Sequence, residues 1–484
     1  MDFKKSKKFL LTLGALYWAL VLMIYIVAGD QFHYTVVTSD ALSPLSVIGE
    51  IGEGIQVEQR LLAPVEQISS VDILAATYGR ANTGTLNLSL KNTQGEEVAQ
   101  GSADVSELKD GQYTTIPIQQ TAPISNSEAL TLTLTSEGAG EGNAVSVYYG
   151  NTVIAGRFDI AQNIVPEDIY TVNGAMGAGR LCVKLNGVRA LNFYKTYWVI
   201  VAGIFAAIAA YAVRGYKLAQ KGVNNGVVAI CTLYTRYGFL LHQLVSRDFK
   251  TKYKRSVLGM AWSFLNPLLT MAVQYIVFST LFKSDIPNYP VYLLSGIVLF
   301  NFFNEAVSMG MTSITSNASL IKKVYMPKYI YPVSRVCSSL INFMLAIIPL
   351  FLVMLVTGTP FRPSLLLLVF DILCLLGFVT GMGLLLSTAM TFFQDTQFLW
   401  TVLSMIWMYL TPLFYPESII PAQFLTLYHI NPMYQYITFA RICIIDGVSP
   451  EPMAYLWCIV SSLVVLMIGL AAFKKHQDKF VLYL

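Results

Sequence analysis

Apolar stretches about as long as a bilayer is thick recur along this chain, and they constrain its fold more than any other feature. About 20 consecutive apolar residues cross the hydrocarbon core as a helix. The first such stretch covers residues 9–28 and the second covers 196–213. Six more follow, at 260–282, 291–312, 336–357, 364–390, 397–415 and 453–473. The sequence therefore predicts a polytopic α-helical membrane protein with eight spans.

The composition agrees with a membrane protein. Of the 484 residues, 55% are hydrophobic and only 12% are charged, whereas soluble domains carry about 25% charged residues. The net charge of +4 conceals an asymmetry, because residues 30–195 hold 18 acidic and 9 basic side chains. The basic residues elsewhere lie beside apolar spans, which argues against a nucleic-acid partner. No cluster of Cys and His residues indicates a metal site.

Basic residues at the span ends predict the topology. Four lysines precede the first apolar stretch, and the positive-inside rule places them in the cytoplasm. The alternative is a cleaved signal peptide, but its apolar core usually has about 7–15 residues. We favour an uncleaved anchor over residues 1–29. Residues 196–221 then return the chain to the inner side. With eight spans, the sequence predicts a protein of the cell membrane whose two termini both lie in the cytoplasm.

Residues 30–195 have a different pattern. Segments 85–90 and 130–134 alternate apolar and polar residues with a period of two, which is typical of half-buried strands. Several such strands predict an antiparallel β-sandwich on the outer side of the membrane. Cys182 is the one cysteine in this region, so an internal disulfide is excluded.

Residues 222–258 predict a linker and an amphipathic helix at the inner membrane interface. Apolar residues recur at helical spacing over 233–249, with polar residues between them. Five basic residues follow within nine positions, immediately before an apolar span: Arg247, Lys250, Lys252, Lys254 and Arg255. Such a cluster suits the anionic inner leaflet. Residues 259–484 then form a six-span core, whose proline-rich loop 415–452 predicts short helices dipping into the outer face.

Five motifs occur in order over residues 230–484. They are Arg247-Asp248 with Lys250, Tyr253, Ser256, Leu258-Gly259, Trp262 and Asn266-Pro267; residues 317–324 with Pro327; Phe393-Gln394-Asp395; residues 411–416 with Pro421; and Asn431-Pro432 with Arg441. Together they resemble the permease core of ATP-binding-cassette (ABC) polysaccharide exporters, which include O-antigen and teichoic-acid export permeases. The family often has Arg before this Asp395, where the chain has Gln394. Typical members lack a counterpart of residues 1–220.

The resemblance implies an exporter that moves a lipid-linked polysaccharide outward and is not itself an enzyme. The chain has no GxxxxGK[ST] loop, so a partner must hold ATP. The family implies two copies of a separate ATPase, which uses ATP and magnesium, and a second permease copy. A homodimer is expected, and a heterodimer is the alternative. An exporter of lipids or drugs, and a glycan-processing or glycan-sensing protein that works through the sandwich, are alternative functions.

The resemblance also implies roles for individual residues. The ATPase is expected to press on the loop after span 291–312, through Asn317, Ala318, Ser319, Leu320, Ile321, Lys322, Lys323 and Val324. The alternative is that the lysines only signal topology. The five basic residues at 247–255 are expected to receive the diphosphate of the lipid-linked substrate, with anchoring to anionic lipid as the alternative.

Aromatic and polar residues are candidates for the lining of the sugar path: Trp262, Asn266, Tyr275, Trp400, Trp407, Tyr409 and Tyr415. Aromatic belts facing lipid are the alternative. The expected outer gate contains Pro416, Pro421, Asn431, Pro432 and Arg441. Contact with sugar in the sandwich is a hypothesis for Tyr78, Tyr113, Tyr148 and Tyr149, with packing inside the domain as the alternative. Glu305 and Asp371 lie within spans, where we expect interhelical hydrogen bonds or dimer contacts.

Overall fold

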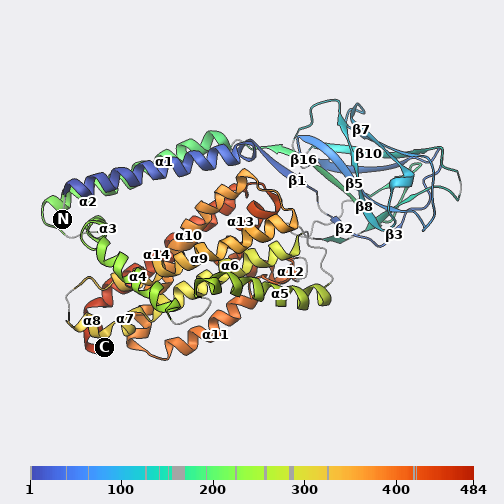
Figure 1. Ribbon diagram of the computed structural model, residues 1–484. Helices are drawn as coiled ribbons and strands as arrows, with labels where there is room; N and C mark the ends of the chain where they lie inside the picture. The colour runs from blue at the N-terminus through green and yellow to red at the C-terminus, as the bar shows by residue number, and fades with distance from the viewer. Residues whose placement is uncertain are drawn as a thin grey trace. The chain divides into compact units, whose positions relative to one another are not determined.

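The computed structural model describes residues 3–39, 41–63, 65–125, 128–140, 142–150, 152–154, 169–191, 193–223, 226–254, 259–282, 288–323, 326–417, 420 and 422–484. The chain divides into two compact units (Figure 1). Residues 1–29 and 195–484 form a helical membrane unit, and residues 30–194 form a β unit.

The membrane unit is built from helices of very different lengths. They are α1 (Phe3–His33), α2 (Phe193–Gln220), α3 (Gly226–Thr235), α4 (Gly238–Tyr253), α5 (Trp262–Phe282), α6 (Tyr289–Met311), α7 (Ser313–Ser316), α8 (Ala318–Lys323), α9 (Ile330–Thr357), α10 (Leu368–Phe392), α11 (Thr396–Tyr409), α12 (Ala422–Ile430), α13 (Pro432–Arg441), α14 (Pro452–His476) and α15 (Phe480–Tyr483). The turn η4 (Pro363–Leu367) precedes α10, the π-helical turn η6 (Ile442–Asp446) follows α13, and η7 (Gln477–Lys479) joins α14 to α15.

Seven helical segments of the described residues are long and apolar enough to cross a membrane: Lys4–Gly29, Phe193–Gln220, Gly259–Ser279, Tyr289–Met311, Ile330–Thr357, Pro363–Phe392 and Pro452–Tyr483. They confirm the polytopic helical class. The one predicted span that is missing from these segments, 397–415, forms a shorter helix than expected, because α11 has 14 residues. At about 1.5 Å per residue it is shorter than a hydrocarbon core of roughly 30 Å. The helix ends where the chain enters Thr411-Pro412, since proline cannot continue the hydrogen-bond ladder.

Glycines allow the central helices to approach closely. Helices α6, α9, α10 and α14 lie side by side (Figure 1). A Cβ atom on Gly469 of α14 would clash with the carbonyl oxygen of Gly381 in α10. Gly310 of α6 faces Gly383 of α10 in the same way. Small residues at such crossings are the usual means of packing helices in lipid, where apolar side chains gain little from leaving the solvent.

The β unit is a sandwich of two seven-stranded sheets. Its strands are β1 (Tyr34–Thr38), β2 (Ala41–Ser43), β3 (Ser46–Val47), β4 (Val57–Ala63), β5 (Gln67–Ala76), β6 (Thr85–Lys91), β7 (Glu97–Asp104), β8 (Gln112–Pro117), β9 (Gln119–Gln120), β10 (Glu128–Glu137), β11 (Ser146–Gly150), β12 (Thr152–Ile154), β13 (Thr171–Val172), β14 (Ala175–Met176), β15 (Arg180–Leu181) and β16 (Val183–Ala190). One sheet has the order β1-β16-β5-β11-β15, with β3 beside β11 and β8 beside β5; the other has the order β14-β13-β4-β10-β6-β7-β9. Strands β2 and β12 form a separate two-stranded sheet. All pairs between named strands are antiparallel, as the sequence predicts.

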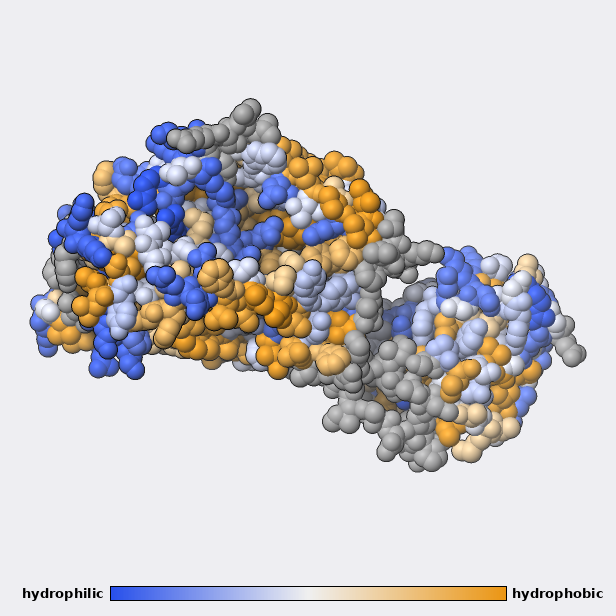
Figure 2. All heavy atoms as spheres, turned by 90° about the horizontal axis from the view of Figure 1, so that it is seen from below, coloured by the Kyte–Doolittle hydropathy of each residue, from blue (hydrophilic) through white to orange (hydrophobic). Residues whose placement is uncertain are grey.

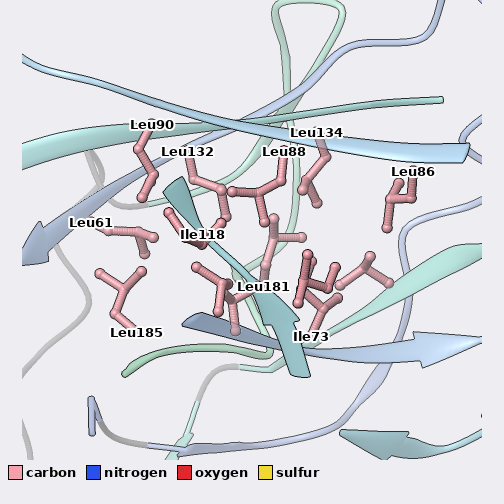
Figure 3. Packing of buried hydrophobic residues seen from close by; sticks show 14 of the residues in the cluster. Leu61, Ile73, Leu86, Leu88, Leu90, Ile118, Leu132, Leu134, Leu181 and Leu185 are labelled. Carbon is pink, nitrogen blue, oxygen red and sulfur yellow. The ribbon is translucent and has the colours of Figure 1, made fainter. Parts of the chain in front are cut away.

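The alternating segments supply the core of the sandwich. Leucines of β6 and β10 point inward from one sheet and meet Ile73, Leu181 and Leu185 of the other (Figure 3). Leu132 lies opposite Leu90 in the register between β10 and β6, and both are fully buried. Cys182 is a free, buried thiol, and burial raises its pKa to about 11.

The first and last strands of the β unit are neighbours. Strand β1 pairs with β16 over five residues, from Tyr34 opposite Ala190 to Thr38 opposite Asn186. Beyond the ladder, the N–H of Leu191 donates to the carbonyl of His33 over 2.7 Å, and the His33 ring stacks on Tyr194. In the membrane unit, Tyr17 of α1 donates to a carbonyl of α2, and Tyr197 of α2 donates to a carbonyl of α1, each over 2.8 Å. Helices α1 and α2 therefore form an antiparallel pair.

The Leu132 side chain should dominate a stability test of the sandwich. Replacing it with alanine leaves a cavity in a dry core, so we expect Leu132→Ala to cost about 2–5 kcal/mol. Leu62 in β4 is the matched control, because it is 57% exposed, and Leu62→Ala should cost no more than about 0.5 kcal/mol. Protease resistance of residues 30–194 during thermal denaturation measures both; equal losses would contradict the assigned register.

Candidate functional site

Helix α4 carries most of the predicted basic cluster. Leu244 is buried, whereas Arg247, Lys250, Lys252 and Lys254 are exposed. The predicted amphipathic segment 233–249 is not one helix, because α3 ends at Thr235 and α4 begins at Gly238. Gly238 would destabilise the interior of one continuous helix, and it instead occupies the first position of α4. Arg255 lies outside the described residues.

An acid within the basic run draws α9 to α4. The carboxylate of Asp248 has 6% of its side chain exposed. It lies 3.1 Å from Arg247 of the same helix and 3.1 Å from Arg335 of α9. Arg247 also donates to the Asn317 side-chain oxygen over 3.3 Å, between α7 and α8. Asp248 thus fixes two guanidinium groups beside each other, which mutual repulsion would otherwise separate.

A second acid ties α4 to α6. Lys252 pairs with the Glu305 carboxylate at 2.8 Å, and Asn342 of α9 donates to the same oxygen over 2.8 Å. The expected interhelical hydrogen bond of Glu305 is thereby confirmed. Asp371 differs, because neither of its fully buried carboxylate oxygens accepts a hydrogen bond from the described residues.

Two cavities meet at this ion pair. One, of about 470 Å³, is lined by residues of α4, α6, α7, α9 and the α7–α8 junction, including Arg247, Asp248 and Arg335. The other, of about 320 Å³, is lined by residues of α4, α5, α6 and α9, including Trp262, Asn266 and Asn301. Lys252, Glu305 and Asn342 line both cavities. We call the two together the polar cleft.

The polar cleft can hold an anionic group next to apolar surface. Its cations, Arg247, Lys252 and Arg335, already have carboxylate partners, but their remaining N–H donors are suited to phosphate oxygens. Trp262 and Phe302 line the smaller cavity, beside Asn266 and Asn301. Sequence reasoning did not assign Asp248, Arg335 or Asn342 to the site. The sequence does contain a signal for Asp248, because it is the one acidic residue within the run of five basic residues at 247–255.

The basic segments of the membrane unit gather at one end. Phe9 of α1 stacks on Tyr234 of α3, and Tyr329 before α9 donates to Ala229 of α3. Lys328 donates to the carbonyl of Gln477 over 2.6 Å. Figure 2 shows hydrophilic side chains gathered toward the end of the membrane unit at which Figure 1 places α8 and the C-terminal residues. The rest of that face includes broad apolar areas.

Of the predicted coupling residues, Ala318–Lys323 form the short helix α8, and Asn317 precedes it. Asn317 lies between α7 and α8, and its side chain donates to the Ser313 carbonyl over 2.8 Å, so it closes α7. Ile321 is buried and Leu320 is half-buried. These two side chains therefore do not form an exposed apolar surface. Ser319, Lys322 and Lys323 are exposed, Ala318 is half-buried, and Val324 lies outside the described residues.

The candidates for the sugar path fall into three groups. Trp262 and Asn266 line the smaller cavity. Trp400 and Trp407 pack inside the unit: their indole N–H groups donate to Ser308 over 3.0 Å and to Asn431 over 2.7 Å. The remaining candidates lie at the surface or in the turn after α11: Tyr275 and Tyr409 are exposed, and Tyr415 donates to the Tyr409 carbonyl.

Arg441 holds the turn that follows α11. Its guanidinium donates to the carbonyls of Pro412, Leu413 and Tyr292, over 2.8, 3.0 and 3.2 Å. It also lies 3.4 Å from the centre of the Tyr292 ring, a cation–π contact. Asn431 caps α13 by accepting from the N–H of Met433, and Pro432 occupies the first turn. The expected short helices of the loop are thus α12 and α13. Pro416 is half-buried, and Pro421 lies outside the described residues.

The four candidate tyrosines of the sandwich have different surroundings. Tyr113 and Tyr148 pack against buried Leu42, Leu74 and Cys182, and burial raises the pKa of Tyr113 to about 12. Tyr149 packs against the main core. Tyr78 is 43% exposed and has a left-handed backbone, with φ of 56°.

The hydrogen bonds of the Arg441 guanidinium should contribute more to the free energy of unfolding than its positive charge alone. Arg441→Gln leaves buried carbonyls without donors, so we expect a loss of about 2–4 kcal/mol. Arg441→Lys should restore only part of this loss in the free energy of unfolding, because an ammonium group lacks the planar set of N–H donors of a guanidinium. Arg362→Gln is the control, since Arg362 is exposed and donates one bond, to Asp446. Thermal unfolding of the protein in nanodiscs measures all three; an equal effect of Arg362→Gln would contradict this role.

Comparison with known proteins agrees with this arrangement. Residues 240–445 match the family described as ABC-2 type transporter. The chain is 30% identical over 245 residues to an O-antigen export system permease protein of Klebsiella pneumoniae, covering 50% of this chain and 93% of that protein. It is 30% identical over 252 residues to one from Myxococcus xanthus, covering 51% and 95%. It is 22% identical over 240 residues to the polysialic acid transport protein of Escherichia coli, covering 49% and 92%. The chain belongs to the ABC-2 type transporter family, as a multi-pass membrane permease.

Proposed function

We propose that the chain is the permease of an ABC exporter that moves a lipid-linked polysaccharide from the cytoplasmic to the outer side. The observation that carries this proposal is the match across nearly the whole length of O-antigen export permeases. An ABC-2 permease implies a partner ATPase, which supplies the energy. The end of the membrane unit with α8 and the basic segments is then cytoplasmic, and residues 30–194 lie outside.

The polar cleft is the proposed entry site for the substrate. A lipid diphosphate carries its charge beside an apolar tail, and the cleft offers Arg247, Lys252 and Arg335 next to Trp262. Lys252 can exchange the single charge of Glu305 for a diphosphate, which is a stronger acceptor. Lys250 and Lys254 extend the positive surface along α4, where anionic lipid or substrate can approach.

A second permease copy would complete the path. In the single chain, helix α11 exposes four large apolar side chains: Phe398, Leu399, Val402 and Leu403. Its 14 residues are nevertheless too few to span a hydrocarbon core of about 30 Å. A protein neighbour does not impose that length. We therefore propose that α11, which ends at the exposed Tyr409, contacts a second permease copy. Two ATPase subunits would then bind the pair of permeases.

Tyr78 is the proposed sugar contact of the sandwich. The Arg80 guanidinium lies 4.8 Å from the centre of its ring. Arg80 is itself fixed, because it pairs with Glu50 and donates to the Gly142 carbonyl over 2.9 Å. Hydrogen bonds from Arg80 and from the Gly142 N–H lower the pKa of Glu50. One exposed ring on a fixed support is suited to stacking on a sugar.

Removing two cations from the polar cleft should abolish substrate recognition. We expect Arg247→Gln with Lys252→Gln to reduce ATP turnover stimulated by lipid-linked glycan at least tenfold, because roughly 1.5–3 kcal/mol accompanies each charged hydrogen bond. Binding of the ATPase should persist. Arg236→Gln is the control, since Arg236 is exposed outside the cleft. The assay uses permease and ATPase in proteoliposomes, and unchanged stimulation of the double variant would overturn the entry site.

Tyr78→Ala should weaken glycan binding by the outer domain about fivefold to tenfold, from the loss of about 1–1.5 kcal/mol of ring contact. Tyr34→Ala is the control, because Tyr34 is also exposed but lies on β1. The full chain in nanodiscs is titrated with the glycan of its own cell surface, by interferometry. If Tyr78→Ala binds as the unaltered chain does, or if no glycan binds, the sandwich has another role.

A further inference from the structure

Residues 477–484 fold back onto residues 313–323, which comprise α7 and α8 and are called the coupling segment below. The Phe480 ring is fully buried against Ile321 of α8, Ile314 of α7, and Phe473 near the end of α14. Tyr331 of α9 and Leu384 of α10 complete this cluster. One aromatic side chain from α15 therefore joins the coupling segment to three long helices.

Polar and aromatic contacts hold this segment in place. Lys328 donates to the carbonyl of Gln477 over 2.6 Å, and its ammonium lies 5.9 Å from the centre of the Phe480 ring. The Phe392 ring, at the end of α10, lies 4.8 Å from Tyr483 and 6.0 Å from Phe480. Residues 477–484 are thus fixed at both ends and are part of the folded membrane unit.

This packing changes what α8 offers to a partner. Its apolar side, with Ile321 and part of Leu320, is occupied by α15. Its outer side presents Ser319, Lys322 and Lys323. The binding energy of a protein interface comes mainly from desolvated apolar and aromatic anchors, with charges at the rim. Helix α8 by itself therefore offers a partner the charged rim of an interface but no apolar anchor at its centre.

Exposed apolar side chains lie immediately beside α8. Leu482 is 82% exposed and Tyr483 is 59% exposed, and Val481 is exposed as well. They follow Asp478 and Lys479, which are also exposed. Although the candidate span is Pro452–Tyr483, α14 itself ends at His476, and the charged residues at 474, 475, 478 and 479 separate these side chains from its apolar part.

We propose that Val481, Leu482 and Tyr483 form the apolar centre of the docking surface for the partner ATPase, and that α8 forms its basic rim. This proposal rests on the proposed function, in which the ATPase presses on α8. The surface fits a partner groove with an apolar floor and acidic side chains beside Lys322, Lys323 and Lys479. Through Phe480, force on this surface reaches α14 and α10 together with α9.

The test adds a charge at the centre of the surface. Leu482→Asp should weaken binding of the ATPase to the full permease in nanodiscs at least tenfold, measured by interferometry. Its thermal unfolding should not change, because Leu482 is exposed. Leu62→Asp is the matched control, an exposed leucine of the sandwich that receives the same charge, and its ATPase affinity should equal that of the unaltered chain.

A second variant separates this inference from the proposed function. Lys322→Gln with Lys323→Gln removes the rim charges on α8. If this variant binds the ATPase more weakly and Leu482→Asp does not, the apolar centre is refuted and coupling at α8 stands. If neither variant alters binding, coupling at α8 is itself refuted.

A photo-reactive phenylalanine analogue at position 482 identifies the occupant directly. Cross-linking to the ATPase subunit in the assembled complex supports the proposal. Cross-linking to lipid, or to a second permease copy, with none to the ATPase overturns it, because α15 would then be a membrane contact or a permease interface.

Discussion

Charged side chains beside membrane-spanning helices need partners, and this requirement organises the end of the membrane unit that holds α4. An uncompensated charge in hydrocarbon costs several kcal/mol, roughly 2.5–3.5 on insertion scales. Asp248 pairs with Arg247 and Arg335, and Glu305 pairs with Lys252. These pairs draw α4 against α6 and α9 and leave the polar cleft between them. Groups that satisfy each other in this way also remain available to a more strongly charged ligand.

The spans and the sandwich could be predicted because each follows a local pattern. A bilayer requires long apolar helices, and a two-layer sheet requires alternation, as in Leu86, Leu88 and Leu90, which are all buried. Helix α11 departs from its prediction because Thr411-Pro412 ends it within a longer apolar stretch. Apolar content alone does not reveal where a helix stops.

The site was predicted less completely because its contacts join distant residues. The basic run on α4 is visible in the sequence, but Arg335 lies on α9 and shares the carboxylate of Asp248 only in the fold. Ile321 reads as an exposed apolar residue in a loop, yet Phe480, far along the chain, buries it. Likewise, spacing alone does not separate Tyr78 from Tyr113, which packs against Leu74 and Cys182. Side-chain partners between elements require the three-dimensional structure.

The pairing of β1 with β16 has a consequence for how such a chain can be assembled. Since the first and last strands are hydrogen-bonded to each other, the β unit begins and ends at neighbouring points. A globular module with adjacent termini could therefore join α1 to α2 in place of this β unit without interrupting the helices that follow α2. Recombination at these two junctions could therefore exchange the whole β unit while the membrane helices stay unchanged.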